Sequence, residues 1–138
     1  MSIARSVASL RITTRTLSPQ ELAEAVGAPP TYLREKGRPL TDEIPDGPTY
    51  ESTVWMLRAG LSGYRSMNEQ VTWLAWRIAE RRDAMARLRD QATLDIYCVC
   101  EQLGDGGRVT FSPDALQLFG DLGIAIVMDI YSVGDAEL

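Results

Sequence analysis

The same helix-start signal occurs at two distant points in the chain, and it strongly constrains the fold. Residues 16–22 read TLSPQEL and residues 110–116 read TFSPDAL. In each copy a serine, Ser18 or Ser112, is followed by proline. Serine is a preferred helix N-cap and proline is preferred at the first helical position. Each copy therefore predicts the start of a helix. A diverged internal duplication is an alternative origin for the likeness.

A third start signal opens the longest amphipathic segment. Ser66 is followed three residues later by Glu69, as in a capping box. Apolar residues then recur at spacings of three, four and seven, which indicates one helical face turned to a core. This stripe comprises Met67, Val71, Leu74, Ile78, Met85 and Leu88. Trp73 widens the stripe, whereas Trp76 falls away from it and is a candidate for a second contact surface. The three predicted helices span about 18–26, 66–90 and 112–122.

Segments of strand length and composition separate these helices. They lie at about 6–14, 50–58, 92–101 and 123–131, with a weaker candidate within 31–38. A GDGG turn at 104–107 could return 108–110 as a short strand. This order predicts one α+β domain over residues 1–138, a two-layer sandwich of three helices on a mostly antiparallel sheet of four to six strands. The last strand is nearly all apolar, so we expect it to be central in the sheet.

Composition excludes several kinds of chemistry. The chain has no histidine and two cysteines, so it lacks the Cys and His ligands of a zinc site and any nucleophile activated by histidine. Cys98 and Cys100 are expected to be buried, reduced thiols. We expect no cofactor and no metal. A net charge of −5 argues against nucleic-acid binding, and no apolar run is long enough for a membrane span. The first residues lack the apolar region of a signal peptide, which predicts a cytoplasmic location.

Several landmarks together resemble a known family. They are LRI near the start, LSPQELAEAVGAPPTYLREKG, TVWML, LDIYCVC, and VTFSPDALQLFGDLGIAIVMDIY near the end. Over residues 8–131 the chain resembles a bacterial family described as domain of unknown function 4279. The GAPPT stretch departs modestly from that family's LG-x-P-T-like pattern. The resemblance implies a single-domain fold and supplies no activity and no catalytic residue.

Strand alternation predicts a candidate binding surface. If residues such as Ile12, Met56 and Ile96 face the helices, the intervening residues share the opposite face of the sheet. Those residues are Arg11, Trp55, Asp95, Tyr97, Asp129 and Tyr131. Arginine and aromatic side chains are enriched at protein interfaces. The proline-rich segment 27–48 or a second subunit could instead cover this face.

We therefore expect a non-enzymatic module that binds a protein partner in a bacterial cytosol. An immunity- or antitoxin-like protein is one concrete form of it, and a homodimer is an alternative assembly. The alternative function is a small-ligand binder or an enzyme that uses Arg11, Asp95, Asp129 and Tyr131. A deep pocket lined by those residues would favour the alternative, and a flat face would favour the module. The arginines at positions 77–89 alternate with acidic residues, which is typical of a solvated helix face rather than a phosphate-binding patch.

Overall fold

A computed structural model describes residues 3–103 and 107–133 of the chain. The described residues form five strands and four helices, in the order β1 (Ile3–Thr14), α1 (Pro19–Val26), β2 (Tyr32–Arg34), β3 (Thr53–Arg58), α2 (Met67–Glu80), α3 (Arg82–Leu88), β4 (Ala92–Leu103), α4 (Pro113–Leu122) and β5 (Ala125–Val133). The predicted α+β class is correct, and the weak strand expected within 31–38 is present as β2. Most of the predicted GDGG turn, residues 104–106, lies outside the described residues. Residues 108–110 do not form a strand.

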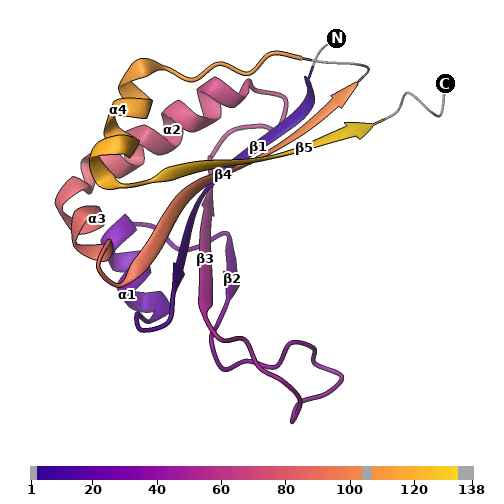
Figure 1. Cartoon of the computed structure of the whole chain (residues 1–138), viewed down its shortest axis with the longest axis vertical. Coiled ribbons are helices and arrows are strands. Elements are labelled where there is room, and N and C mark those ends of the chain that lie inside the picture. Colours follow the sequence, from indigo (N-terminus) through magenta and orange to yellow (C-terminus); the bar gives the residue numbers. More distant parts are fainter. Residues whose placement is uncertain (1–2, 104–106, 134–138) are drawn as a thin grey trace.

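The sheet is mixed, with strand order β2-β3-β1-β4-β5. The β2–β3, β3–β1 and β1–β4 pairings are antiparallel, as expected, whereas β4 and β5 are parallel. The expectation that the last strand is central was wrong, because β5 is an edge strand. The α4 crossover returns the chain parallel to β4 and leaves the other side of β5 without a neighbouring strand among the described residues (Figure 1). Although β5 is largely apolar, it is not buried throughout: the side chain of Ile130 is 58% exposed.

The helix-start signals are confirmed by cap geometry. The side chains of Ser18, Ser66 and Ser112 each accept a hydrogen bond from the backbone amide three residues later, at 3.1 to 3.2 Å. The helices that follow Ser18 and Ser112 end at Gly27 and Gly123, whose φ angles are +80° and +69°. Glycine adopts this left-handed conformation without the steric cost that other residues meet.

The long helix predicted over 66–90 is in fact two helices. Arg81, with φ −120° and ψ 28°, separates α2 from α3. Ile78 and Met85, on opposite sides of this break, are both buried. After the break, α3 packs beside α1 (Figure 1), and its Met85 and Leu88 side chains join the shared core. The apolar spacing of seven residues across the break is compatible with a continuous helix, so the sequence pattern did not reveal it.

All four helices cover one face of the sheet and share a single core with it (Figure 1). Fully buried side chains of β1 and β4, such as Leu10 and Ile96, meet Leu74 of α2 and Phe119 of α4 in this core. The opposite face of the sheet carries no helix of the described residues. The molecule is thus a two-layer sandwich with one sheet face left open.

Residues 35–52 form an arm that projects beyond β2 and β3 (Figure 1). Its two sides are joined by a bridge between Pro39 and Thr49 and by a 3.0 Å hydrogen bond from the Leu40 amide to the Pro48 carbonyl. The arm leads away from the sheet and does not lie over its open face. Of the two coverings anticipated for that face, the proline-rich segment is therefore excluded.

Candidate functional site

Four of the six predicted surface residues meet on the open face of the sheet. Arg11 of β1 lies directly opposite Asp95 of β4, and Tyr97 follows two residues later on the same side of β4. Asp129 of β5 is paired in register with Val99, one step along that face from Tyr97. Strand alternation and the β1–β4–β5 pairing together bring these side chains into one row.

Arg11 and Asp95 form a two-pronged ion pair. The Nε and Nη2 atoms of Arg11 donate to the two carboxylate oxygens of Asp95, at 2.9 and 3.0 Å. The side chains are 27% and 13% exposed, so the pair is partly shielded from water. The guanidinium also lies 4.3 Å from the centre of the Tyr97 ring, a distance at which a cation is attracted to an aromatic face.

Tyr97 links this pair to the edge strand. Its hydroxyl donates a hydrogen bond to Oδ2 of Asp129. That bond, together with burial and the negative charge of Asp129, raises the pKa of Tyr97 above its ordinary value of 10.0. The phenol therefore stays protonated at neutral pH. Asp95 and Asp129 thus bind different partners, Arg11 and Tyr97.

Tyr131 lies further along the same strand and remains open to solvent. It follows two residues after Asp129, so the two side chains lie on the same side of β5, and Tyr131 is 53% exposed. It belongs to the same face, at the outer edge of the row.

The predicted position of Trp55 was wrong. Trp55 is fully buried and pairs in register with Ile12, so it faces the helices. Met56, which was expected in the core, is opposite Arg11 on the open face. The segment TVWML is apolar at four consecutive positions, so alternation alone could not decide which side of β3 faces the core. The face of the sheet without helices, the open face, thus carries five of the six predicted residues: Arg11, Asp95, Tyr97, Asp129 and Tyr131.

Both cysteines occupy the core, as expected. Cys98 and Cys100 are completely buried and make no disulfide. Burial raises the pKa of both thiols, that of Cys98 to about 12. Such thiols are almost entirely protonated at neutral pH and are poor nucleophiles.

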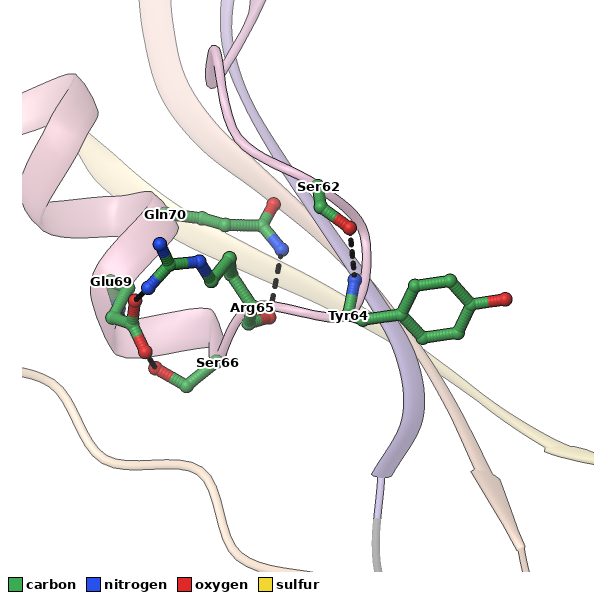
Figure 2. Close-up of polar contacts among 6 residues, drawn as sticks. All are labelled: Ser62, Tyr64, Arg65, Ser66, Glu69 and Gln70. Atoms are coloured by element: carbon green, nitrogen blue, oxygen red, sulfur yellow. Dashed lines mark hydrogen bonds and ion pairs between the residues drawn. The ribbon is translucent and has the colours of Figure 1, made fainter.

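The sequence did not single out Gln70, a polar residue buried to 1% exposure on α2. Its Oε1 accepts from the Ala8 amide at 2.9 Å, and its Nε2 donates to the carbonyls of Ser6 and Arg65 at 2.7 and 3.1 Å. Figure 2 shows the bond to Arg65 beside the start of α2. Gln70 thereby ties α2, β1 and the segment before α2 together. Its position next to Val71 on the buried stripe is the one sequence signal that could have identified it.

Trp76 is exposed, as its position outside the apolar stripe predicted. It is 74% exposed and borders a shallow hollow with Leu61 and Trp73. A large aromatic side chain in this position is a common feature of contact surfaces.

The larger hollows lie away from the open face. One of about 720 Å³ lies at the start of α2, and one of about 610 Å³ lies between β2 and the arm. Neither is lined by Arg11, Asp95, Tyr97, Asp129 or Tyr131. Within residues 3–103 and 107–133, no group of three or more cysteine or carboxylate side chains could hold a metal ion. None of the helices in this part of the chain has the length and apolarity that crossing a membrane requires.

Comparison with known proteins places the chain in a family. A sequence model described as Domain of unknown function (DUF4279) matches residues 4–133. The chain belongs to this family. The match includes β1 and β5 as well as the helices between them, so the residues of the open face lie inside it. No curated protein and no solved structure matches the chain.

Proposed function

We propose that this DUF4279 protein is a non-enzymatic module of a bacterial cytosol that binds a protein partner through the open face of its sheet. The observation that carries the proposal is the state of the charges there. Arg11 is paired with Asp95, and Asp129 accepts a hydrogen bond from Tyr97. A partner can cover Arg11 and Asp95 without burying an unpaired charge, which would otherwise be costly. The negative charge of Asp129 is hydrogen-bonded but not neutralised by Tyr97, so it calls for a cationic side chain on the partner.

The remaining surface of this face suits protein contact. Arg11, Asp95, Tyr97 and Asp129 form a polar row on this face. The apolar residues around the row, Val99, Val127 and Met56, are half-buried, and Tyr131 is exposed. Apolar area combined with tyrosine and arginine side chains is typical of protein interfaces. The chain's net charge of −5 favours a partner with a basic surface. An immunity- or antitoxin-like protein that occludes a basic target is one form of this function.

The enzymatic alternative has less support. The raised pKa of Tyr97 makes it a poor general base at neutral pH. The two larger hollows are lined by other residues. An enclosed site usually positions a small ligand, and none of Arg11, Asp95, Tyr97, Asp129 and Tyr131 lines either hollow.

The test is to install a photo-crosslinking residue at position 131 and identify the protein joined to it in the native host. Binding of the purified partner is then measured for Tyr131→Ala and for Tyr64→Ala. Tyr64 is the matched control, because it is 87% exposed and lies at the start of α2. We expect Tyr131→Ala to weaken binding at least about tenfold and Tyr64→Ala to leave it unchanged. Equal affinities for both variants would show that the partner does not bind this face. Crosslinking to a second copy of the chain would replace the foreign partner with a homodimer.

A further inference from the structure

The hollow of about 720 Å³ at the start of α2 gathers positive charge in an acidic protein. Arg5, Arg65 and Arg108 line it, and Glu69 is the one carboxylate among the lining residues that the structure describes. These arginines come from three separate parts of the chain: β1, the segment before α2, and the segment before α4. The surplus of positive charge contrasts with the net charge of −5 for the whole chain.

The backbone beneath this hollow is held rigidly. The buried Gln70 side chain bonds the carbonyls of Ser6 and Arg65, and the Ser6 amide donates to the Gly63 carbonyl at 2.9 Å. Arg5 lies close against Gly63, since a β-carbon at that glycine would be 3.0 Å from the Nε atom of Arg5. The positions from which Arg5 and Arg65 extend are therefore fixed before any ligand binds.

One of the three arginines is already engaged. Nη1 of Arg65 bonds Oε2 of Glu69 at 2.7 Å, and Glu69 also accepts from the Ser66 hydroxyl (Figure 2). The ring of Tyr64 points away from this pair in the same view. Arg5 and Arg108 are exposed and form no ion pair with any residue that the structure describes.

The start of α2 adds a weaker attraction for an anion. Ser66 caps the helix by accepting from the Glu69 amide, while Met67 and Asn68, in the first turn, line the hollow. First-turn amides have no carbonyl partner within the helix, and the helix dipole favours negative charge at this end. Arginine is well suited to phosphate, because its planar fork can donate two parallel hydrogen bonds to phosphate oxygens.

We propose that this hollow binds the phosphate group of a small ligand, with Arg5 and Arg108 as the primary contacts and Arg65 as a third. The site is distinct from the open face of the sheet. The shared chemistry is a dianionic phosphate, either free or as a monoester.

The proposal is tested by calorimetric titration of the full chain with inorganic phosphate, pyrophosphate and glycerol 3-phosphate at constant ionic strength. We expect saturable binding of one ligand per chain. Preference for glycerol 3-phosphate would identify a monoester ligand, and preference for phosphate or pyrophosphate would identify an inorganic one. Arg5→Ala and Arg108→Ala should each weaken binding about threefold to tenfold. Arg87→Ala is the matched control, because Arg87 is an exposed arginine on α3 and does not line the hollow.

Unchanged affinity in both hollow variants would overturn the proposal, as would an equal loss in Arg87→Ala, which would indicate non-specific screening. Absence of saturable binding of all three probes would also overturn it. Because Arg5 and Arg108 are exposed, the variants should unfold at the parent's temperature in the absence of ligand. Arg5→Lys provides a second measure: it keeps the charge but loses the fork, so its affinity should fall between those of the parent and Arg5→Ala.

Discussion

Replacing Gln70 by methionine should destabilise the protein strongly, although it puts an apolar residue into an apolar helix face. The two side chains have similar length and volume, so the change leaves little cavity. What it removes is the partner of the Ala8 amide and of the Ser6 carbonyl, both held by Gln70 at 2.9 and 2.7 Å. Ala8 is 0% and Ser6 3% exposed, so water does not readily replace the lost bonds.

The magnitude follows from these two orphaned groups. A buried polar group left without a partner costs about 1–3 kcal/mol, so Gln70→Met should lower the free energy of unfolding by about 2–6 kcal/mol. Urea unfolding followed by tryptophan fluorescence measures this change. Gln117→Met is the matched control. Gln117 is exposed on α4, and its side chain makes a single hydrogen bond to the described residues, to Asp121 at 3.0 Å. Replacing Gln117 should therefore change the free energy of unfolding by no more than about 0.5 kcal/mol.

Gln70→Glu adds a dependence on pH. The introduced carboxylate would face the carbonyl oxygens of Ser6 and Arg65, which now accept from Nε2 of Gln70. Its charged form is therefore disfavoured in the folded protein, and its folded pKa should lie above the unfolded value of about 4.3. The destabilisation should be largest above the folded pKa and should shrink as the pH falls through it.

If Gln70→Met unfolds at the parent's urea midpoint, the two backbone groups have other partners and the reasoning is refuted.

Three further predictions concern the caps, the thiols and the polar row. Replacing any of the three N-cap serines by alanine should cost about 0.5–2 kcal/mol in urea unfolding, and three variants as stable as the parent would contradict the cap geometry. Cys98 and Cys100 should react with a thiol reagent at pH 8 far more slowly in the native protein than in urea, because burial raises the pKa of both thiols. Rapid labelling of the native protein would mean that β4 is exposed. Tyr97→Phe should lower stability by about 1 kcal/mol at pH 7, because Asp129 loses its donor. Since the folded pKa of Tyr97 is raised, its contribution is complete below pH 10 and is lost as the pH rises through the folded pKa. The phenylalanine variant should therefore lose less stability than the parent at alkaline pH, and parallel alkaline profiles would count against the bond.

Local chemistry explains what the sequence predicted well. A serine followed by proline, or by glutamate three residues on, satisfies the first amides of a helix regardless of the rest of the fold. The three helix starts were therefore correct. The alternation of LDIYCVC likewise placed both cysteines in the core and Tyr97 opposite, because one face of β4 is covered by helices and the other is not.

The errors arose where the deciding interaction is distant in sequence. TVWML has apolar side chains on both sides of β3, and Trp55 faces the core because it is paired with Ile12, more than forty residues earlier. The edge position of β5 depends on the α4 crossover, which strand composition does not encode. The break at Arg81 preserves the apolar spacing on either side, so periodicity cannot detect it.

Gln70 and the open face illustrate opposite uses of polar side chains in this fold. Gln70 is buried, and its side chain bonds backbone atoms, so it joins α2 to β1 and is not accessible to a binding partner. Arg11 and Asp95 are bonded to each other across two strands, and part of each side chain is exposed on the open face. Removing Arg11 would leave the Asp95 carboxylate, only 13% exposed, without its partner, so an Arg11 variant would mix a folding defect with any binding defect. Tyr131 lies at the end of the row and is 53% exposed, so its replacement by alanine should leave no buried charge unpaired. It is therefore the residue at which partner binding can be separated from stability.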